Sequence, residues 1–502
     1  MQQKKGAVAM EGFYLNEDNS NFFVSFPESD MTLDGIRKFI LGYAGKQVGA
    51  VVMSVNSSRA SFDSKVIEPI WAGVTEDADG NLFFRGRTLD KGAANWIRNA
   101  KKLHDDGIDI YKEWIDALHA AGKEAWISCR MNDLHNVDDE DSYMHDKFWR
   151  EHPEYRRAAY LGKESWFGRA MDFAIDDVRA HKFDILNEQL ERYDADGFEL
   201  DWTRFPAYFK PGCEMRDAHL ITEMLRTLRD VSHGFEVKRG HKIKIGARVL
   251  SSIEDCLRFG LDVVSWVQEG LVDSLTVGNF WPTINSDIPF ETWRAALGRK
   301  VEINAGLEVT ALPFSGVPEP KLMPLTKEMI AACTSEYIYR GADNIYLFNL
   351  MNGGTGMHDL ANFKIVLDNC GLAETAYSMP RRHVLTFCTM RPQGIKEGYS
   401  LPRRLQGWQS FRLNVGGGTQ DRDAFIVIGL DSEPCDGFEF QCYLNAEKCE
   451  IASVPAMRYP SFVKGCICAK ASGGALHDGD NVIDIRADGA ELTADWCEIF
   501  IP

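Results

Sequence analysis

Two patterns of apolar residues alternate along the chain from about residue 20 to residue 370. A short run rich in β-branched and other apolar side chains is followed by a polar loop, and then by a segment whose apolar residues recur at helical spacing. Such helical segments end at a glycine before the next apolar run. The clearest predicted helices are 109–121, 177–193 and 327–340.

The apolar runs number eight, and each has the length of a strand. Strands that alternate with helices are typical of a parallel sheet with crossover helices. Eight such strands close a (β/α)8 TIM barrel, although a doubly wound open sheet is the structural alternative. We expect an N-terminal extension over 1–19 and the barrel over 20–372. The predicted strands are 22–26, 48–55, 124–130, 196–201, 243–249, 272–277, 301–307 and 343–348.

After residue 375 the helical spacing disappears and short alternating runs follow, separated by Gly, Pro and Asp. Examples are 424–428, 438–443 and 481–485. This pattern predicts a C-terminal β-sandwich domain over 375–502. Its role, structural support or ligand binding, stays open at this point.

Composition and charge narrow the partners. The chain has 502 residues, 45% of them hydrophobic and 26% charged, and a formal net charge of −18. This charge disfavours nucleic acid or an anionic membrane as a partner, although a local basic pocket is compatible with it. No segment has the ~20 apolar residues of a membrane span. A homo-oligomer is compatible with the sequence.

The N-terminus and the cysteines bear on localisation. The first ten residues lack the apolar run of ~7–15 residues that a secretory signal needs. The twelve cysteines include no CxxC pair, and Cys466-Ile-Cys468 has the wrong spacing for a zinc site. We therefore expect free thiols and a cytoplasmic protein, or a secreted or periplasmic one if a signal has been removed.

The fourth predicted strand ends in charged and aromatic residues, Asp196-Gly-Phe-Glu-Leu-Asp-Trp-Thr-Arg-Phe-Pro206. Strand residues alternate between two faces, so Glu199 and Asp201 share a face, with Asp201 nearer the carboxyl end. Ligands bind at that end of a parallel sheet. Asp201 is therefore the first candidate for a catalytic group.

The other strand ends carry amides, guanidinium groups and aromatic rings, which together suit a hydroxyl-rich ligand. Tryptophans near these ends could stack on pyranose rings: Trp71, Trp166, Trp202 and Trp281. Each alone more often belongs to the core, and it is their concentration near the strand ends that favours stacking. The polar candidates are Asn56, Arg59, Arg130, Asn132, Asp133, His135, Arg204, Arg248, Asn279, Glu308, Asn349 and Asn352.

Asp201 and Glu308, at the ends of the fourth and seventh predicted strands, are the best candidates for a carboxyl pair. Cleavage of a glycosidic bond usually needs one protonated and one ionised carboxyl. Arg204 and Arg130 could keep Asp201 ionised. Glu308 lies in a more apolar stretch, where burial would raise its pKa as a general acid requires. The alternative for Glu308 is an ordinary loop carboxylate.

A family resemblance rests on the same region. The motifs Ile175-Asp-Asp-Val-Arg179 and Gln189-Leu-Glu-Arg-Tyr-Asp, which runs into the fourth strand, resemble (β/α)8 glycoside hydrolase-like proteins, especially glycosyl hydrolase-like family 10. Gly260-Leu-Asp-Val and Trp266-Val-Gln-Glu-Gly-Leu-Val-Asp273 fit that group as well. The similarity covers most of 20–370. It implies a sugar-processing barrel with Asp201 as a catalytic residue, and it implies no particular substrate.

The fourth strand also resembles the chitinase-type DxxDxDxE motif, with Asp196, Glu199 and Asp201 in the first three acidic places. The fourth place holds Thr203, so the essential acid is missing. Substrate-assisted chitin hydrolysis is therefore disfavoured. Glu199 is then best interpreted as a supporting residue beneath Asp201.

Motifs of other chemistries are missing: HxH in the first strand, HExxH, a Walker loop and GxSxG. Asp133, His135 and Asp172 could gather around a cation, but a lone histidine more often hydrogen-bonds, here to a sugar hydroxyl. We therefore predict no metal and no cofactor.

Three functions stay open. The first is a glycoside hydrolase with a carbohydrate substrate, acting through Asp201 and Glu308. The second is a polysaccharide lyase, in which Arg130 or Arg248 binds a uronate and His135 or a tyrosine removes a proton. The third is a non-catalytic glycan-binding barrel.

Overall fold

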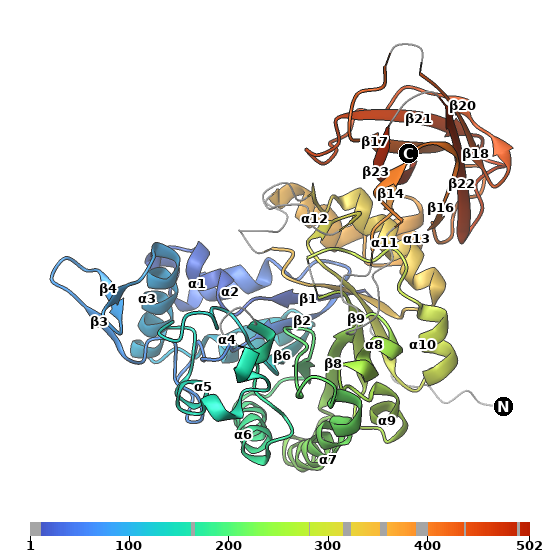
Figure 1. The fold of residues 1–502 in the computed structure, drawn as a ribbon. Helices are drawn as coiled ribbons and strands as arrows, with labels where there is room; N and C mark the ends of the chain where they lie inside the picture. The colour runs from blue at the N-terminus through green and yellow to red at the C-terminus, as the bar shows by residue number, and fades with distance from the viewer. Residues whose placement is uncertain are drawn as a thin grey trace.

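A computed structural model describes residues 12–161, 166–280, 282–314, 323–351, 359–387, 400–435, 438–488 and 492–502. A closed barrel of eight parallel strands forms the larger body, and antiparallel sheets form a second body at the C-terminal end (Figure 1). The barrel order is β1-β13-β10-β9-β8-β7-β6-β2. Its strands are β1 (Phe13–Glu17), β2 (Val48–Ser54), β6 (Glu124–Arg130), β7 (Gly197–Asp201), β8 (Lys244–Leu250), β9 (Ser274–Gly278), β10 (Glu302–Leu307) and β13 (Asn344–Leu347).

The first barrel strand is not where the sequence pattern placed it. The expected strand 22–26 is wrong, because Asn21–Ser25 is the helix α1, and the barrel begins at Phe13 inside the expected extension. The rings of Phe22 and Phe26 pack against Phe39 of α2 (Leu33–Leu41), and Phe22 also packs against Trp114 of α4 (Ile110–Ala120). A five-residue apolar run does not by itself separate a strand from a buried helix.

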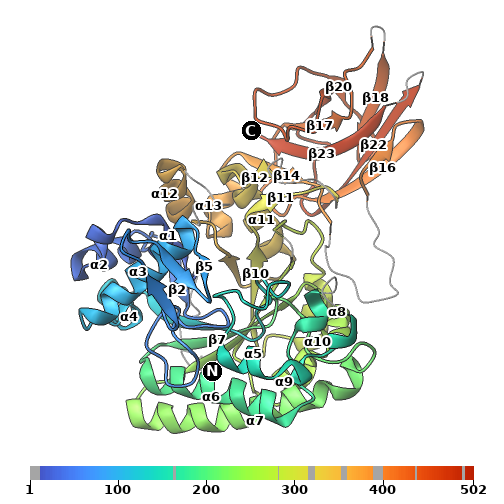
Figure 2. The ribbon, with the colours of Figure 1, turned by 60° about the vertical axis from the view of Figure 1, so that its left-hand side comes forward.

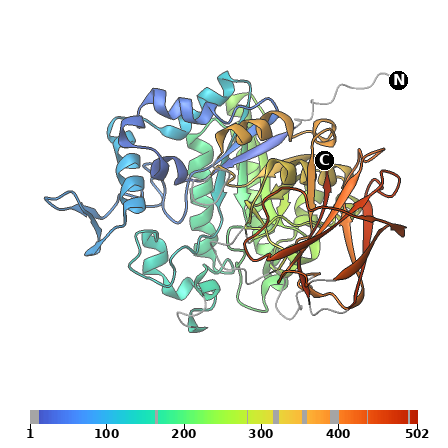
Figure 3. The same ribbon diagram turned by 90° about the horizontal axis from the view of Figure 1, so that it is seen from above.

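Helices cover the outside of the barrel (Figure 3). The predicted segments 109–121 and 327–340 are confirmed as α4 and α11, and 177–193 as α6. Glycines with positive φ, Gly122 at +69° and Gly341 at +119°, lie just beyond α4 and α11. The remaining helices are α3 (Lys91–Asp105), α5 (Lys147–Glu151), α6 (Asp176–Arg192), α7 (Glu214–Arg239), α8 (Ile253–Arg258), α9 (Val263–Gln268), α10 (Phe290–Leu297), α11 (Lys327–Arg340), α12 (Leu360–Asn369) and α13 (Ala373–Tyr377).

The loops between barrel elements contain short strands and 3-10 helices. A three-stranded antiparallel sheet projects from the barrel beside α3 (Figure 1), and a two-stranded one follows β10. These strands are β3 (Val74–Glu76), β4 (Leu82–Phe84), β5 (Arg87–Thr88), β11 (Thr310–Ala311) and β12 (Met323–Pro324). The 3-10 helices are Glu28–Asp30, Pro153–Tyr155, Ala159–Leu161 and Trp166–Arg169.

The barrel interior is filled by large rings that face small residues. A buried cluster inside the barrel includes Tyr14, Trp126 and Tyr346. Gly197 and Gly246, on the next two strands, leave room for Trp126. An added Cβ at Gly197 would lie 2.4 Å from Trp126 Cδ2, and one at Gly246 would lie 2.9 Å from Trp126 Cζ3. Glycine at both positions therefore permits the close approach of the indole.

The C-terminal body is a β-sandwich, as the sequence predicted. One face of each sheet contributes to a shared apolar core. The first sheet contains β14 (Arg381–Val384), β15 (Arg403–Arg404), β17 (Ala424–Leu430), β20 (Glu450–Ile451), β21 (Gly465–Ala471) and β23 (Thr493–Ile501). The second contains β16 (Gly407–Asn414), β18 (Glu439–Leu444), β19 (Glu447–Lys448) and β22 (Asp480–Asp488).

The sandwich packs on the barrel through β14 and α11, which lie together at the junction (Figure 2). Trp496 of β23 is fully buried and belongs to the same apolar cluster as the barrel helices. In the loop after β9, the backbone N–H of Ser286 donates to the Oγ1 of Thr386, which follows β14, at 2.8 Å. The Asn279 amide, in the same loop, donates to the Phe387 carbonyl at 3.2 Å. The loop after β9 is thus fixed by both bodies.

Within the described ranges, none of the helices has both the length and the apolar character to span a bilayer. The eleven cysteines in those ranges form no disulfide.

Candidate active site

A cavity of about 640 Å³ opens at the carboxyl ends of the barrel strands. Its volume falls in the range of about 300–1,000 Å³ that is typical of small-ligand sites. Three phenylalanines give it apolar walls: Phe205, Phe280 and Phe348. Its polar lining at the strand ends consists of Asp18, Asn19, Arg130, His135, Arg204, Glu308 and Asn349.

Asp201 and Glu308 bind the same guanidinium group. Arg248, on β8, donates from Nη1 to Asp201 Oδ1 at 3.1 Å and from Nη2 to Glu308 Oε1 at 2.6 Å. The backbone N–H groups of Thr203 and Arg204 also donate to Asp201 Oδ1, at 3.1 and 3.0 Å. All three donors use Oδ1. Within the described residues, Asp201 Oδ2 and Glu308 Oε2 accept no hydrogen bond.

Burial controls the protonation of the carboxyls around this guanidinium. Burial raises the pKa of Glu308 to about 7, although the charges of Arg248 and Arg204 act to lower it. One pleat below Asp201, burial and the Asp201 charge raise the pKa of Glu199 to about 7. Glu199 Oε1 accepts from the hydroxyls of Ser128 at 2.8 Å and Tyr346 at 2.9 Å. Glu308 thus has a pKa suited to giving up a proton near neutral pH.

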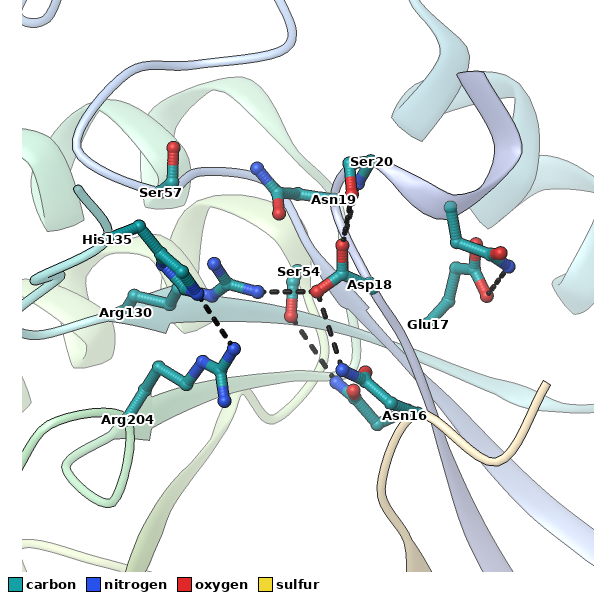
Figure 4. Close-up of polar contacts among 12 residues, drawn as sticks. Asn16, Glu17, Asp18, Asn19, Ser20, Ser54, Ser57, Arg130, His135 and Arg204 are labelled. Carbon is teal, nitrogen blue, oxygen red and sulfur yellow. Dashed lines mark hydrogen bonds and ion pairs between the residues drawn. The ribbon is translucent and has the colours of Figure 1, made fainter. Parts of the chain in front are cut away.

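A second polar network crosses the other side of the cavity (Figure 4). Arg130 donates from Nη2 to Asp18 Oδ2 at 2.5 Å and from Nη1 to Asp133 Oδ2 at 3.0 Å. His135 Nδ1 lies 2.8 Å from Asp133 Oδ1, and Arg204 Nη2 lies 3.0 Å from His135 Nε2. Burial acts to raise the pKa of Asp18, but the Arg130 charge and the hydrogen bonds from Ser20 bring it below its ordinary value. Asp18 is therefore ionised.

The structure brings part of the predicted residues together at the cavity. Arg130, His135, Arg204, Glu308 and Asn349 line it, and Asp201 and Arg248 lie directly behind Glu308. Asn349 has a positive φ of 48°, and its amide lies 3.5 Å from Asp18 Oδ2. Glu199 lies deeper, among barrel-interior side chains.

Other predicted residues hold loops and are not part of the cavity lining. Asn56 donates to the carbonyl of the residue that follows it, at 2.6 Å. Arg59 donates to the Tyr143 carbonyl at 3.0 Å and to the Ala72 carbonyl at 2.6 Å. Asn132 donates to a carbonyl beyond β7 at 2.8 Å, and Asn279 to two loop carbonyls. All four are buried.

Of the predicted tryptophans, the three that the structure describes do not form a stacking platform over the cavity. Trp202 is fully buried among other aromatic rings on the helix side of β7. Trp71 is stacked on a histidine of α3. Trp166 is stacked on Phe280, a residue of the cavity wall. Trp281 and Asn352 lie outside the described residues.

Asp18 and the three phenylalanines are site residues that the sequence reasoning missed. Asp18 follows β1, so the misplaced first strand hid it. Phe205, Phe280 and Phe348 each lie within four residues after a barrel strand, and that position was the available signal.

The chain was compared with protein families, curated proteins and solved structures. No protein-family model matches it, and no curated protein matches it. Matched solved structures include α-L-fucosidase isoenzyme 2 from Paenibacillus thiaminolyticus, with 13% identity, a TM-score of 0.42 and coverage of 73% of this chain and 49% of that chain. The glycoside hydrolase domain of PgaB from Bordetella bronchiseptica matches with 10% identity, a TM-score of 0.41 and coverage of 72% and 99%. An endo-fucoidan hydrolase of glycoside hydrolase family 107 matches with 14% identity, a TM-score of 0.41 and coverage of 97% and 67%.

The matched region spans about half the length of that fucosidase.

Proposed function

We propose that this protein is a glycoside hydrolase that cleaves an oligo- or polysaccharide with Asp201 and Glu308 as its carboxyl pair. One observation carries the proposal: two carboxyl groups, from β7 and from the residue after β10, are held on one guanidinium, and the one that lines the cavity, Glu308, has a pKa of about 7. A glycosidase needs such a pair, with one group protonated and one ionised.

Glu308 fits the general acid. Glu308 lines the cavity, and burial raises its pKa to about 7. Its Oε2 accepts no hydrogen bond from another described residue, so this oxygen is available to a substrate. Asp201 fits the partner carboxylate, because its Oδ1 accepts from Arg248 and from two backbone N–H groups. Oδ2 would then attack the anomeric carbon or activate water. The separation of the reacting oxygens decides between retention and inversion.

The residues that a lyase would use are already occupied. Arg130 binds two aspartates and Arg248 binds Asp201 and Glu308, so neither is free to bind a uronate without losing an ion pair. Both ring nitrogens of His135 have partners as well. These contacts favour the hydrolase over the lyase.

The test is turnover on a panel of oligosaccharides of defined linkage, followed by reducing-end release and by ultraviolet absorbance. Hydrolysis creates a reducing end without a new double bond. Asp201→Asn should lower turnover by several orders of magnitude with an unchanged circular dichroism spectrum. Glu254→Gln, an exposed carboxyl on α8, is the matched control and should act like wild type.

Other results would contradict the proposal. Products that absorb in the ultraviolet would identify a lyase. Binding without turnover across the panel would identify a glycan-binding barrel. Near wild-type turnover by Asp201→Asn would remove Asp201 from the catalytic pair.

A further inference from the structure

Arg204 is a cation of the cavity that lacks a carboxylate of its own. Its guanidinium lines the cavity, yet no ion pair joins it to a carboxylate of the described residues. Its Nη2 meets only the neutral partner His135 Nε2, and its Nε is buried without a hydrogen bond. Figure 4 shows this guanidinium joined to His135 and separate from the Asp18–Arg130 pair.

The neighbouring carboxylates are committed to the other two arginines. Asp18 and Asp133 both bind Arg130, and Asp201 and Glu308 both bind Arg248. Burial and the nearby Arg130 charge lower the pKa of Arg204, although the charges of Asp18, Asp133 and Asp201 act to raise it. The Arg204 guanidinium therefore feels these carboxylates without a direct ion pair to one of them, and an anion bound directly to it would supply that contact.

His135 holds Arg204 in place without supplying negative charge. An arginine can only donate, so His135 Nε2 must accept, and the ring proton is then on Nδ1, which donates to Asp133 Oδ1. In this tautomer the ring bridges Asp133 and Arg204. The histidine is therefore a positioning residue for Arg204.

The backbone at Arg204 is also strained. The next residue, Phe205, has a φ of +68°, which is costly for a bulky side chain. Its ring packs edge-on against His135 with centroids 5.0 Å apart, and the Arg204 guanidinium lies 5.3 Å from the same ring. Strain of this kind persists where the surrounding structure holds it, and the two residues of this turn, Arg204 and Phe205, both line the cavity.

We propose that Arg204 binds an anionic substituent of the sugar, either a uronate carboxylate or a sulfate ester. The inference rests on the proposed function, because it names the substrate class of the same cavity. A guanidinium presents a planar fork of donors that matches such oxyanions. The net charge of −18 gives no long-range attraction for an acidic glycan, so recognition depends on this local cation.

The test compares three sets of oligosaccharides with one backbone and length: neutral, uronate-bearing and sulfated. Binding to the intact protein is measured by calorimetry. Wild type should bind one anionic set more tightly than the neutral set. Arg204→Gln should weaken the affinity for that anionic set by about ten- to a hundredfold, which is the contribution of a hydrogen bond to a charged group. The affinity for the neutral set should change far less. Arg204→Lys should restore part of the difference.

Arg299→Gln is the matched control, because Arg299 is 81% exposed on the surface and should leave all three sets unchanged. A preference for the uronate set assigns a carboxylate, and a preference for the sulfated set assigns a sulfate. Equal binding of all sets by wild type, or no anion-dependent binding, would overturn the inference. The wild-type comparison decides the matter even if Arg204→Gln fails to fold.

Failure of the inference is distinguishable from failure of the proposed function. Cleavage of neutral glycans without anion preference would retain the hydrolase and remove the role of Arg204. Arg204-dependent binding of anionic glycans without cleavage would retain the subsite and remove the hydrolase.

Discussion

The proton on Glu308 should limit hydrolysis at alkaline pH. The cavity gives this carboxyl a pKa of about 7, because burial outweighs the lowering effect of the Arg248 and Arg204 charges. Half of the enzyme then carries the catalytic proton at pH 7, and the protonated fraction falls about tenfold for each pH unit well above the pKa. Turnover of a natural oligosaccharide should follow that fraction.

Replacement of the acid should separate substrates by leaving group. Glu308→Gln cannot donate a proton, so hydrolysis of an oligosaccharide with a poor leaving group should fall by about 10²–10⁴. An activated aryl glycoside needs little protonation and should lose much less. The alkaline decline near pH 7 should also disappear from the variant.

The assay is initial rate against pH from 4 to 9 for both substrates, with wild type, Glu308→Gln and the Glu254→Gln control. An alkaline decline that persists in Glu308→Gln would assign it to another group. Equal losses on both substrates would mean that Glu308 positions the sugar or acts as nucleophile. Either result would refute its assignment as the acid.

Three further predictions concern stability, each measured by thermal or denaturant unfolding. Gly197→Ala should destabilise the barrel by about 1–3 kcal/mol, because the new methyl group would overlap the indole of Trp126. A neutral effect would mean that the indole moves aside. Glu498→Gln should cost about 3–5 kcal/mol, because it leaves Arg382 as an unpaired charge in a pair of 2.7 Å that is almost fully buried; a cost near zero would contradict the ion pair. Burial raises the pKa of Glu17 in the folded protein to about 8, so this carboxyl ionises at a lower pH in the unfolded chain. Wild type should therefore lose stability relative to Glu17→Gln as the pH rises from about 5 to 8. A stability difference that is constant with pH would contradict the raised pKa.

The sequence predicted most barrel strands because parallel strands are buried on both faces and are therefore continuously apolar. β6 coincides with the predicted run 124–130, and α11 with 327–340. β1 was missed because Asn16 and Glu17 make it partly polar although every residue in it is buried. The more apolar stretch after it was then taken for the strand.

Strand geometry predicted those site residues that belong to a barrel strand or directly follow one. Asp201, Arg248 and Glu308 lie together because parallel strands end at one edge of the barrel. Trp202 has the opposite parity from Asp201, so it points toward the helices, and the alternation could have indicated this. Arg59 lies five residues beyond β2, where the path of the loop decides, and no strand pattern encodes that path.

The contact between the β-sandwich and the loop after β9 has a consequence for modularity. Thr386 and Phe387 bind that loop, and Trp496 is part of the barrel's own apolar cluster. The loop leads directly to Phe280 in the cavity wall. A barrel recombined with a different C-terminal partner would have to rebuild these contacts, so the two bodies are expected to be inherited and engineered as one unit.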